Sequence, residues 1–310
     1  MRVIITGGGG FLGSRLVEVY KRKDNAEIIV IDLQELHLDK CQSIKCDIAT
    51  DGFDVDLLRE GPCLIYHLAS VVSAAAEENW ENAVEQNVLG LMNLLKSCRE
   101  SSFTHRLVFC SSVAVFGGEL ARSEVGDLTK HAPSSTYGMT KAVGELLVND
   151  ATRKGHIDGR TARLPTVIIR PGVANAAASS FASGMFREPL AGKKSVIPVE
   201  MSTELVVISP ETAVAGLCHL AELPGALLGP DKAVNLPGLK VTVREMLSTL
   251  ESLCGTEVSS LVTQLADSRI EKVVASWPSL WNDLRSRTLG FDSDESLVTI
   301  IETYLEGLSR

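Results

Sequence analysis

Short apolar segments alternate with amphipathic helical segments through the first half of the chain. Six runs rich in β-branched residues predict strands, at residues 3–6, 27–31, 43–47, 64–68, 106–111 and 166–170. Between the fourth and fifth runs, residues 77–99 carry apolar side chains at helical spacing, among them Val84, Val88 and Leu91. Strands that alternate with helices predict the α/β class, with a Rossmann-type, doubly wound parallel sheet covered on both faces.

The pattern changes after Arg170. Residues 172–184 are rich in glycine, alanine and serine, and helical patterns return only at the segments 210–223, 243–253 and 295–305. A short apolar run at 233–236 is expected to rejoin the main sheet. The predicted division is a first domain over residues 1–171 and a smaller C-terminal domain over residues 172–310.

The first predicted strand leads directly into a glycine-rich turn. Gly7, Gly10 and Gly13 are three residues apart, and a helical pattern follows them. This spacing permits a tight turn, close approach of the backbone to a pyrophosphate, and close packing of the helix, whose N-terminus faces the anion. Gly8, Gly10 and Gly13 fit a second register of the same motif, so the role of each glycine stays open. A glycine turn alone is also compatible with simple flexibility, but its place between a strand and a helix favours phosphate binding.

Asp32 closes the second predicted strand, roughly 20 residues beyond the glycines, where a carboxylate accepts hydrogen bonds from the ribose hydroxyls of an adenosine. No lysine or arginine follows in the segment Leu33-Gln34-Glu35. A 2′-phosphate would therefore meet an uncompensated carboxylate, and the expected cofactor is NAD rather than NADP. The alternative for Asp32 alone is a turn residue at a strand end. Together with the glycines it makes residues 1–171 the expected NAD-binding domain.

Composition narrows the class of protein. The chain has 310 residues, 45% of them hydrophobic and 22% charged, with a formal net charge of −9. These values are ordinary for a globular domain, and the acidic balance argues against nucleic-acid and anionic-membrane partners. The seven cysteines form neither a CxxC pair nor a Cys/His cluster, so we expect reduced thiols and no metal site. No signal peptide and no long uncharged apolar stretch is recognised, which predicts a cytoplasmic protein.

A tyrosine–lysine pair provides the candidate catalytic groups for a redox reaction. Tyr137 and Lys141 are four residues apart, on one face of a predicted helix, and Ser112 follows a strand. A nearby ammonium group favours the phenolate, which makes Tyr137 a candidate base for alcohol oxidation, with Ser112 holding the substrate oxygen. Such pairs also occur by chance as solvated side chains, and a strand-end serine also caps backbone. The preceding glycine loop favours the catalytic interpretation.

Several motifs together resemble one known family, the extended short-chain dehydrogenases/reductases, which include nucleotide-sugar epimerases and dehydratases. The segments that carry the resemblance are 6–13, 47–48, 67–70, 87–90, 111–117, 137–141 and 170–172. It implies that Asn87 supports the catalytic helix. It also implies cofactor contacts at Gly7, Gly10, Phe11, Leu12, Gly13, Asp32, Asp47, Ile48, Leu68, Ala69, Tyr137, Lys141, Pro171 and Val173. The chain departs from the family pattern at Ser70, where alanine is commoner, and at Phe116, where tyrosine is commoner, and neither position is expected to react.

The second half is similar to dehydrogenases of four-carbon sugar acids within that family, in the segments 164–190, 234–239 and 276–278. No carboxylate follows Ser112, so dehydration is not expected. The resemblance implies NAD-dependent oxidation of the C2 hydroxyl of a small sugar acid such as D-erythronate, bound by the C-terminal domain. Candidate substrate contacts are Ser73, Ser112, Tyr137, Asn175, Ser179 and Arg187.

Other interpretations remain open at this stage. Arg187 is a candidate partner for the substrate carboxylate or a solvated cation, and residues 175–183 are compatible with a mobile loop. A UDP-sugar epimerase, a dehydrogenase of another small acid such as L-threonine, and a redox sensor without turnover are the alternative functions. A homodimer through the helices that carry Asn87 and Tyr137 is also expected from the family, although the same apolar stripe would serve against the sheet.

Overall fold

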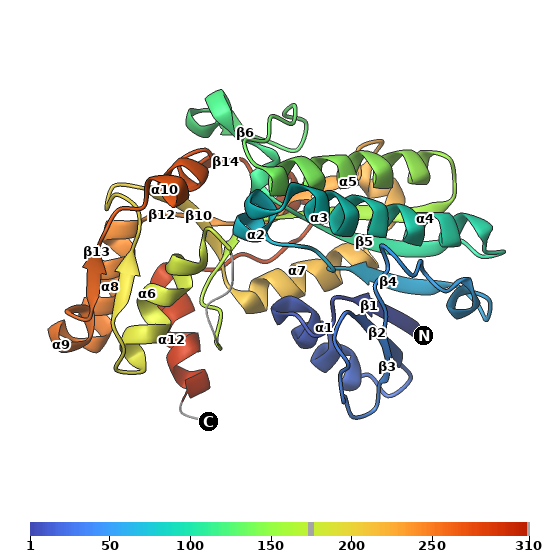
Figure 1. Ribbon diagram of the computed structural model, residues 1–310, viewed down its shortest axis with the longest axis horizontal. Coiled ribbons are helices and arrows are strands. Elements are labelled where there is room, and N and C mark those ends of the chain that lie inside the picture. The colour runs from blue at the N-terminus through green and yellow to red at the C-terminus, as the bar shows by residue number, and fades with distance from the viewer. Residues whose placement is uncertain (173–176, 309–310) are drawn as a thin grey trace.

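A seven-stranded parallel sheet forms the centre of the protein (Figure 1). The computed structural model describes residues 1–172 and 177–308. The strand order is β11-β7-β5-β4-β1-β2-β3, and every neighbouring pair is parallel. The strands are β1 (Arg2–Thr6), β2 (Glu27–Asp32), β3 (Gln42–Lys45), β4 (Cys63–His67), β5 (His105–Ser112), β7 (Ile157–Leu164) and β11 (Ala233–Asn235). The predicted Rossmann-type α/β fold is therefore confirmed, including the return of residues 233–235 to the sheet.

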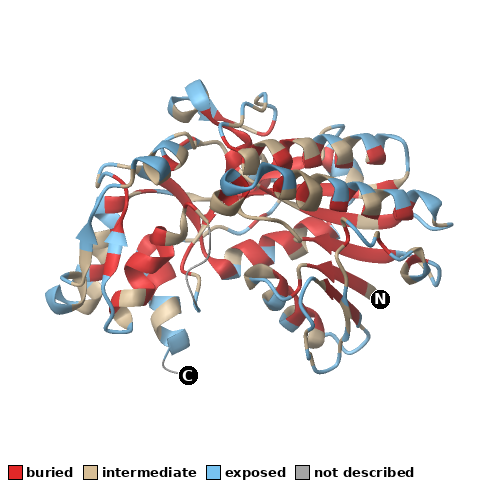
Figure 2. Ribbon diagram, in the orientation of Figure 1, coloured by how far each residue is buried: buried red, intermediate tan, exposed pale blue. Residues whose placement is uncertain are grey.

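Helices cover both faces of this sheet. On one side α1 (Phe11–Lys21) and α7 (Pro210–Glu222) bury Val3 and Ile5 of β1. On the other side α4 (Gly90–Glu100) and α5 (Thr136–Arg153) bury Ile4 of the same strand. Alternate residues of a strand point to opposite faces, so a continuous apolar run is needed to fill two layers. Figure 2 shows the resulting buried sheet between partly exposed helices.

The sixth predicted strand was placed wrongly. Residues 166–170 do not join the main sheet, because its next strand after β5 is β7, residues 157–164. Three charged residues, Asp158, Arg160 and Arg163, interrupt the apolar pattern of β7 and concealed it. The side chains of Arg160 and Arg163 are 0% and 1% exposed and pair with Asp158 and Glu145. Paired charges can be buried, whereas hydrophobic periodicity does not detect them.

A smaller body lies beside the main sheet and includes β8 (Thr166–Val167), β10 (Glu204–Ile208) and β12 (Leu239–Thr242). Its core joins side chains from α6 (Ser180–Leu190), α8 (Val243–Cys254) and α12 (Leu297–Leu308), including Phe186, Met246 and Ile301. The helices predicted near 210, 243 and 295 are confirmed, but α6 was not predicted. Because α7 and β11 return to the main sheet, the chain crosses between the two bodies more often than a single boundary at residue 171 implies.

The predicted helix over residues 77–99 is divided. It consists of α2 (Ser73–Glu78), α3 (Trp80–Val84), a π-helical turn η2 (Glu85–Leu89) and α4. Asn79 separates the first two, since its side chain accepts a hydrogen bond from the Asn82 amide and caps α3. The remaining elements are η1 (Val55–Leu58), η3 (Val113–Val115), η4 (Gly118–Arg122), β6 (Glu124–Val125), β9 (Ser195–Ile197), η5 (Gly225–Leu228), α9 (Thr256–Ser259), β13 (Val262–Gln264), α10 (Ser268–Val274), β14 (Leu280–Trp281) and α11 (Leu284–Thr288). Within the described residues, no helix combines the length and the apolar character needed to cross a bilayer.

Candidate active site

The glycine turn joins β1 to α1 with almost no free space. Gly7 has φ +71°, a left-handed conformation that favours glycine, and a Cβ atom there would lie 2.7 Å from the Ala69 amide nitrogen. A Cβ atom on Gly13 would lie 2.2 Å from the Gly7 carbonyl oxygen. Gly7 therefore forms the tight turn and Gly13 permits the close helix packing, which resolves the register that the sequence left open. Gly10 precedes the first residue of α1, at the helix end that attracts anions.

A first cavity of about 310 Å³, the Asp32 cavity, lies beyond the carboxyl ends of β1 and β2. Its lining includes Gly10, Asp32, Ile48, Leu68 and Ala69. The Asp32 carboxylate accepts hydrogen bonds from the amides of Gly9 and Gln34, at 2.9 and 3.1 Å. These bonds orient an acidic group at the rim of a cavity beside the glycine turn, where a ribose would be recognised.

A second cavity, the Tyr137 cavity, also measures about 310 Å³. Both cavities are lined by Gly7, Gly10, Leu68 and Ser70, so they adjoin along the sheet edge. The predicted residues that line the second cavity are Gly7, Gly10, Phe11, Leu12, Gly13, Leu68, Ser73, Ser112, Tyr137, Lys141 and Ser179. The structure thus brings together side chains from β5, α2, α5 and the segment before α6. It also adds Arg170 and Trp277, which the sequence analysis did not assign to the site.

Tyr137 and Lys141 face this cavity from the first turns of α5. Ser135 begins the helix by accepting a hydrogen bond from the Gly138 amide, at 3.1 Å. The Lys141 ammonium lies 5.5 Å from the centre of the Tyr137 ring and donates a 2.9 Å hydrogen bond to the Cys110 carbonyl. Ser112, at the end of β5, accepts a hydrogen bond from the Ala114 amide, which orients its hydroxyl.

Burial controls the protonation of this pair. It raises the pKa of Tyr137, while the hydrogen bond with Ser112 and the charge of Arg170 act in the opposite direction. Burial also lowers the pKa of Lys141. The expected lowering of the Tyr137 pKa by the lysine is therefore not found in the protein alone, because removal from water disfavours the phenolate more strongly.

Asn87 lies in the π-helical turn η2 and is 3% exposed. Its side-chain oxygen accepts from the Val71 amide at 2.7 Å, and its nitrogen donates to the Val71 carbonyl and to Thr140 Oγ1 at 3.1 and 3.0 Å. Thr140 belongs to α5, so Asn87 joins the loop after β4 to the helix of Tyr137. It lines neither cavity as the structure describes them, which makes it a positioning residue.

A second cation, Arg170, lines the Tyr137 cavity besides Lys141. Its guanidinium has no carboxylate within ion-pair distance among the described residues. Burial lowers the pKa of Arg170, and the charge of Arg187 lowers it further. Trp277 contributes an indole nitrogen that is buried and lacks a partner in the described part of the chain. A partner for either group would relieve an energetic cost.

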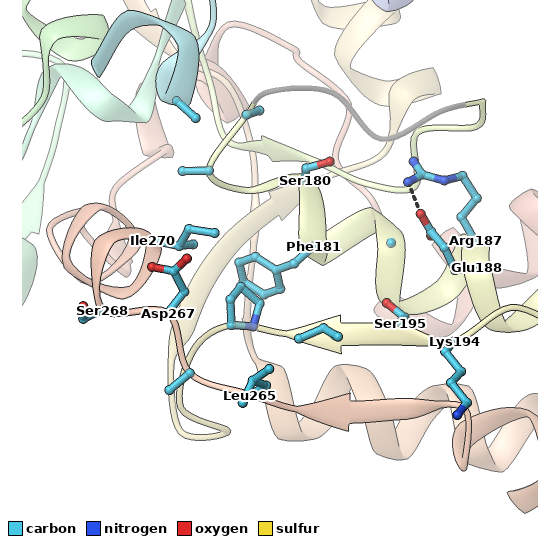
Figure 3. A pocket seen from close by; sticks show the side chains of 17 residues that line it. Ser180, Phe181, Arg187, Glu188, Lys194, Ser195, Leu265, Asp267, Ser268 and Ile270 are labelled. Carbon is cyan, nitrogen blue, oxygen red and sulfur yellow. Dashed lines mark hydrogen bonds and ion pairs between the residues drawn. The ribbon is translucent and has the colours of Figure 1, made fainter. Parts of the chain in front are cut away.

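Arg187 occupies a different cavity. Figure 3 shows this Phe181 cavity, of about 790 Å³, lined also by Ser180, Lys194 and Asp267. The Arg187 guanidinium pairs with Glu188 at 2.5 Å and donates a 2.8 Å hydrogen bond to the Arg170 carbonyl. The structure therefore does not bring Arg187 into the cavity of Tyr137. Arg170 and Arg187 both belong to the second half of the sequence, and only the fold shows that Arg170 is the one that lines the Tyr137 cavity.

Several other predicted contacts are bound to other protein groups or lie outside both cavities. The Asp47 carboxylate is held by Gln86 Nε2, at 3.1 and 2.9 Å, and Asp47 does not line the Asp32 cavity, although its neighbours Cys46 and Ile48 do. Ser73 lines the Tyr137 cavity, but its hydroxyl oxygen already accepts a 2.8 Å hydrogen bond from the Ala178 amide. Pro171 is exposed and lines neither cavity. Val173 and Asn175 lie outside the described residues.

The two adjoining cavities fit a dinucleotide. The glycine turn leaves room for a pyrophosphate, and side chains in place of the glycines would fill that room. The helix N-terminus provides free amide donors. Asp32 lies on one side of the turn and Tyr137 on the other. Asp32 and Gly9 would hold the adenosine half. Lys141 and Tyr137 would hold the other half.

Comparison with known proteins agrees with this geometry. Residues 3–208 match the model of the NAD dependent epimerase/dehydratase family. The chain is 41% identical to a D-erythronate dehydrogenase of Cupriavidus necator, over 100% of both chains, and 40% identical to one of Haemophilus influenzae, over 99% of both. It is similar to the crystal structure of the nucleoside-diphosphate-sugar epimerase from Agrobacterium tumefaciens, with a TM-score of 0.91, 32% identity and coverage of 99% and 94%. The chain therefore belongs to the NAD-dependent epimerase/dehydratase family and is an NAD-dependent dehydrogenase.

Proposed function

We propose that the enzyme oxidises the C2 hydroxyl of D-erythronate to give 2-dehydro-D-erythronate. The observation that carries this proposal is Arg170, a cation without a carboxylate partner among the described residues, in the cavity of Tyr137 and Ser112. A guanidinium binds a carboxylate in a bidentate manner, so Arg170 would hold the acid group of the substrate. The names of the two full-length relatives support a four-carbon sugar acid.

The side chains divide the reaction between them. Ser112 and Tyr137 would hold the C2 hydroxyl oxygen, and the Tyr137 phenolate would accept its proton. Bound NAD supplies the hydride acceptor and a positive nicotinamide ring that favours the phenolate. Lys141 adds a second positive charge near Tyr137, and Ser179 offers a hydroxyl to the remainder of the substrate. Asn87 keeps the helix of Tyr137 in register with the loop after β4.

One assay tests the proposal. The purified enzyme is mixed with NAD and, separately, with D-erythronate, L-threonate, L-threonine or UDP-glucose, and NADH absorbance is followed. We expect NADH formation with D-erythronate, at a kcat/KM well above that for the other compounds. Absence of NADH formation with every four-carbon acid would refute the proposed function.

A nucleotide-sugar epimerase is the second candidate. The Phe181 cavity shares Ala177 with the Tyr137 cavity, so a longer ligand has room beside the catalytic groups. An epimerase would retain its NAD through purification and bind UDP-glucose without net NADH formation. The same panel of compounds therefore separates the two candidates.

We also propose the homodimer expected from the family. Leu89 and Met92, in the helical segment that carries Asn87, are 44% and 46% exposed, and Leu146 on α5 is 61% exposed. Other apolar side chains of these helices, including Leu91 and Leu94, are fully buried against the sheet. The helices therefore have apolar surface beyond what the sheet uses, and measurement of the molar mass in solution tests whether a second copy covers it.

A further inference from the structure

A buried carboxylate lies one helical turn beyond Lys141. Glu145 is 1% exposed and belongs to α5. It accepts a 2.5 Å hydrogen bond from the Ser111 hydroxyl, which precedes Ser112 at the end of β5. It also accepts bonds from the Arg163 guanidinium of β7, the shortest at 2.7 Å, and contacts His131 Nε2 at 2.9 Å. One carboxylate therefore joins β5, β7 and the loop before α5 to the helix that carries Tyr137 and Lys141.

Two buried cations, Arg163 and Lys141, lie near Glu145. Arg163 and Lys141 are 1% and 3% exposed, and both need an anion nearby. Asp127, the other buried carboxylate of this region, is already bound by the Asn235 amide at 2.7 Å and by Arg285 at 2.9 Å. Without Glu145, Arg163 would therefore lose its ion-pair partner, and Lys141 would lose a carboxylate that raises its pKa.

The groups that determine the charge of Lys141 come from several elements. Burial lowers the pKa of Lys141, whereas Cys110 and Glu145 raise it. Burial opposes ionisation of Glu145, but His131 and Arg163 overcome it and lower the pKa of Glu145 below its usual value. The titratable and charged groups that face Lys141 or Glu145 are Cys110 of β5, His67 of β4, Tyr137 of α5, Arg163 of β7 and His131 of the loop before α5.

We propose that Glu145 is a positioning residue for the reaction: it fixes the end of β5 against α5, and its negative charge keeps Lys141 protonated. Residues four apart on a helix are neighbours, so Glu145 acts on Lys141 across one turn. The Ser111 bond acts on the position of Ser112, because the two residues are adjacent. Neither effect requires Glu145 to touch the substrate, and it lines neither cavity as described. The inference rests on the role proposed for Tyr137 and Lys141, but not on the identity of the acid.

The test is Glu145→Gln, which retains the shape and an acceptor oxygen but removes the charge. Loss of a nearby negative charge lowers the pKa of an ammonium group, and Glu145 is one of the two groups that raise the pKa of Lys141. We therefore expect the pH above which activity is lost to be lower in the variant than in the wild type. NADH affinity, measured by fluorescence over the same pH range, should decline at the same lower pH and needs no acid substrate.

Asp158→Asn is the matched control. It also changes a carboxylate to an amide beside a buried arginine of β7, since Asp158 pairs with Arg160 at 2.8 Å. This variant should retain the wild-type pH dependence. If Glu145→Gln does not fold, the double variant Glu145→Gln/Arg163→Met removes both charges of the pair. We expect a smaller downward shift of the pH at which its activity is lost.

The proposal is overturned if the variant that folds loses activity and NADH affinity at the same pH as the wild type. If no acid reacts but NADH affinity is lost at a lower pH, only the proposed substrate is refuted.

Discussion

Arg170→Met is the most direct test of how the substrate is oriented. The guanidinium lines the cavity of Tyr137 and Ser112, and the described residues place no carboxylate within ion-pair distance of it. Burial, and after it the charge of Arg187, lower the pKa of Arg170, so the free enzyme holds this cation at an energetic cost. A bound carboxylate would relieve that cost. A methionine in place of Arg170 has a similar length but no charge with which to bind the carboxylate.

The size of the effect follows from the contact that is lost. A hydrogen bond to a charged group contributes about 1.5–3 kcal/mol, which corresponds to roughly a 10- to 150-fold change in an equilibrium or rate constant. We expect kcat/KM for D-erythronate to fall by this factor in Arg170→Met. The rate with D-erythronamide, which has the same hydroxyls but no negative charge, should change little.

The assay compares the two substrates by NADH absorbance in the wild type, in Arg170→Met and in a control, Arg244→Met. Arg244 is an exposed arginine of α8, in the smaller body. The wild type and the control should prefer the acid to the amide, and Arg170→Met should lose most of this preference. If Arg170→Met prefers the acid as strongly as the wild type, another group binds the carboxylate and the reasoning is refuted.

Three further substitutions test the remainder of the site. Tyr137→Phe should lower kcat by about 10²–10⁴-fold while NAD affinity changes little, and a fully active variant would exclude Tyr137 as the base. Asp32→Ala should reduce the preference for NAD over NADP, compared as kcat/KM, by roughly 10- to 150-fold, because the ribose hydroxyls lose a charged acceptor; an unchanged ratio would remove Asp32 from the ribose site. Gly13→Ala places a Cβ atom 2.2 Å from the Gly7 carbonyl, so it should lower the free energy of unfolding by about 1–3 kcal/mol and weaken NAD binding. A variant with wild-type thermal unfolding and NAD affinity would contradict the close packing at the turn.

The cofactor half of the protein was largely predictable from the sequence. Its strands are continuous apolar runs, and its special positions are glycines, whose role depends on local backbone geometry rather than on distant partners. Asp32 was placed at the end of a strand by the same local pattern. Tyr137 and Lys141 were predicted from their spacing together with Ser112 and the preceding glycine loop, and the structure places both in one cavity.

Three other features, one of them in the main sheet, were less predictable because they depend on tertiary contacts. β7 of the main sheet contains buried arginines that become acceptable only when they are paired, Arg160 with Asp158 of the same strand and Arg163 with Glu145 of α5. α6 follows small residues without clear helical periodicity, and its buried face is determined by the core of the smaller body. The choice between Arg170 and Arg187 required the path of the chain around both cavities. Local patterns predict local structure, whereas charged pairs between distant segments need the fold.

The return of α7 and β11 to the main sheet has a consequence for biosynthesis. Until residue 235 has left the ribosome, β7 has no neighbouring strand on the side that β11 will occupy, and an exposed edge can pair with other chains. The apolar layer beneath the sheet also waits for Leu217 and Phe291. The dinucleotide-binding half therefore matures late in translation, and a fragment ending near residue 171 would lack part of its own core. A chimera that takes its smaller body from a relative would have to keep α7 and β11 from the same chain as the main sheet.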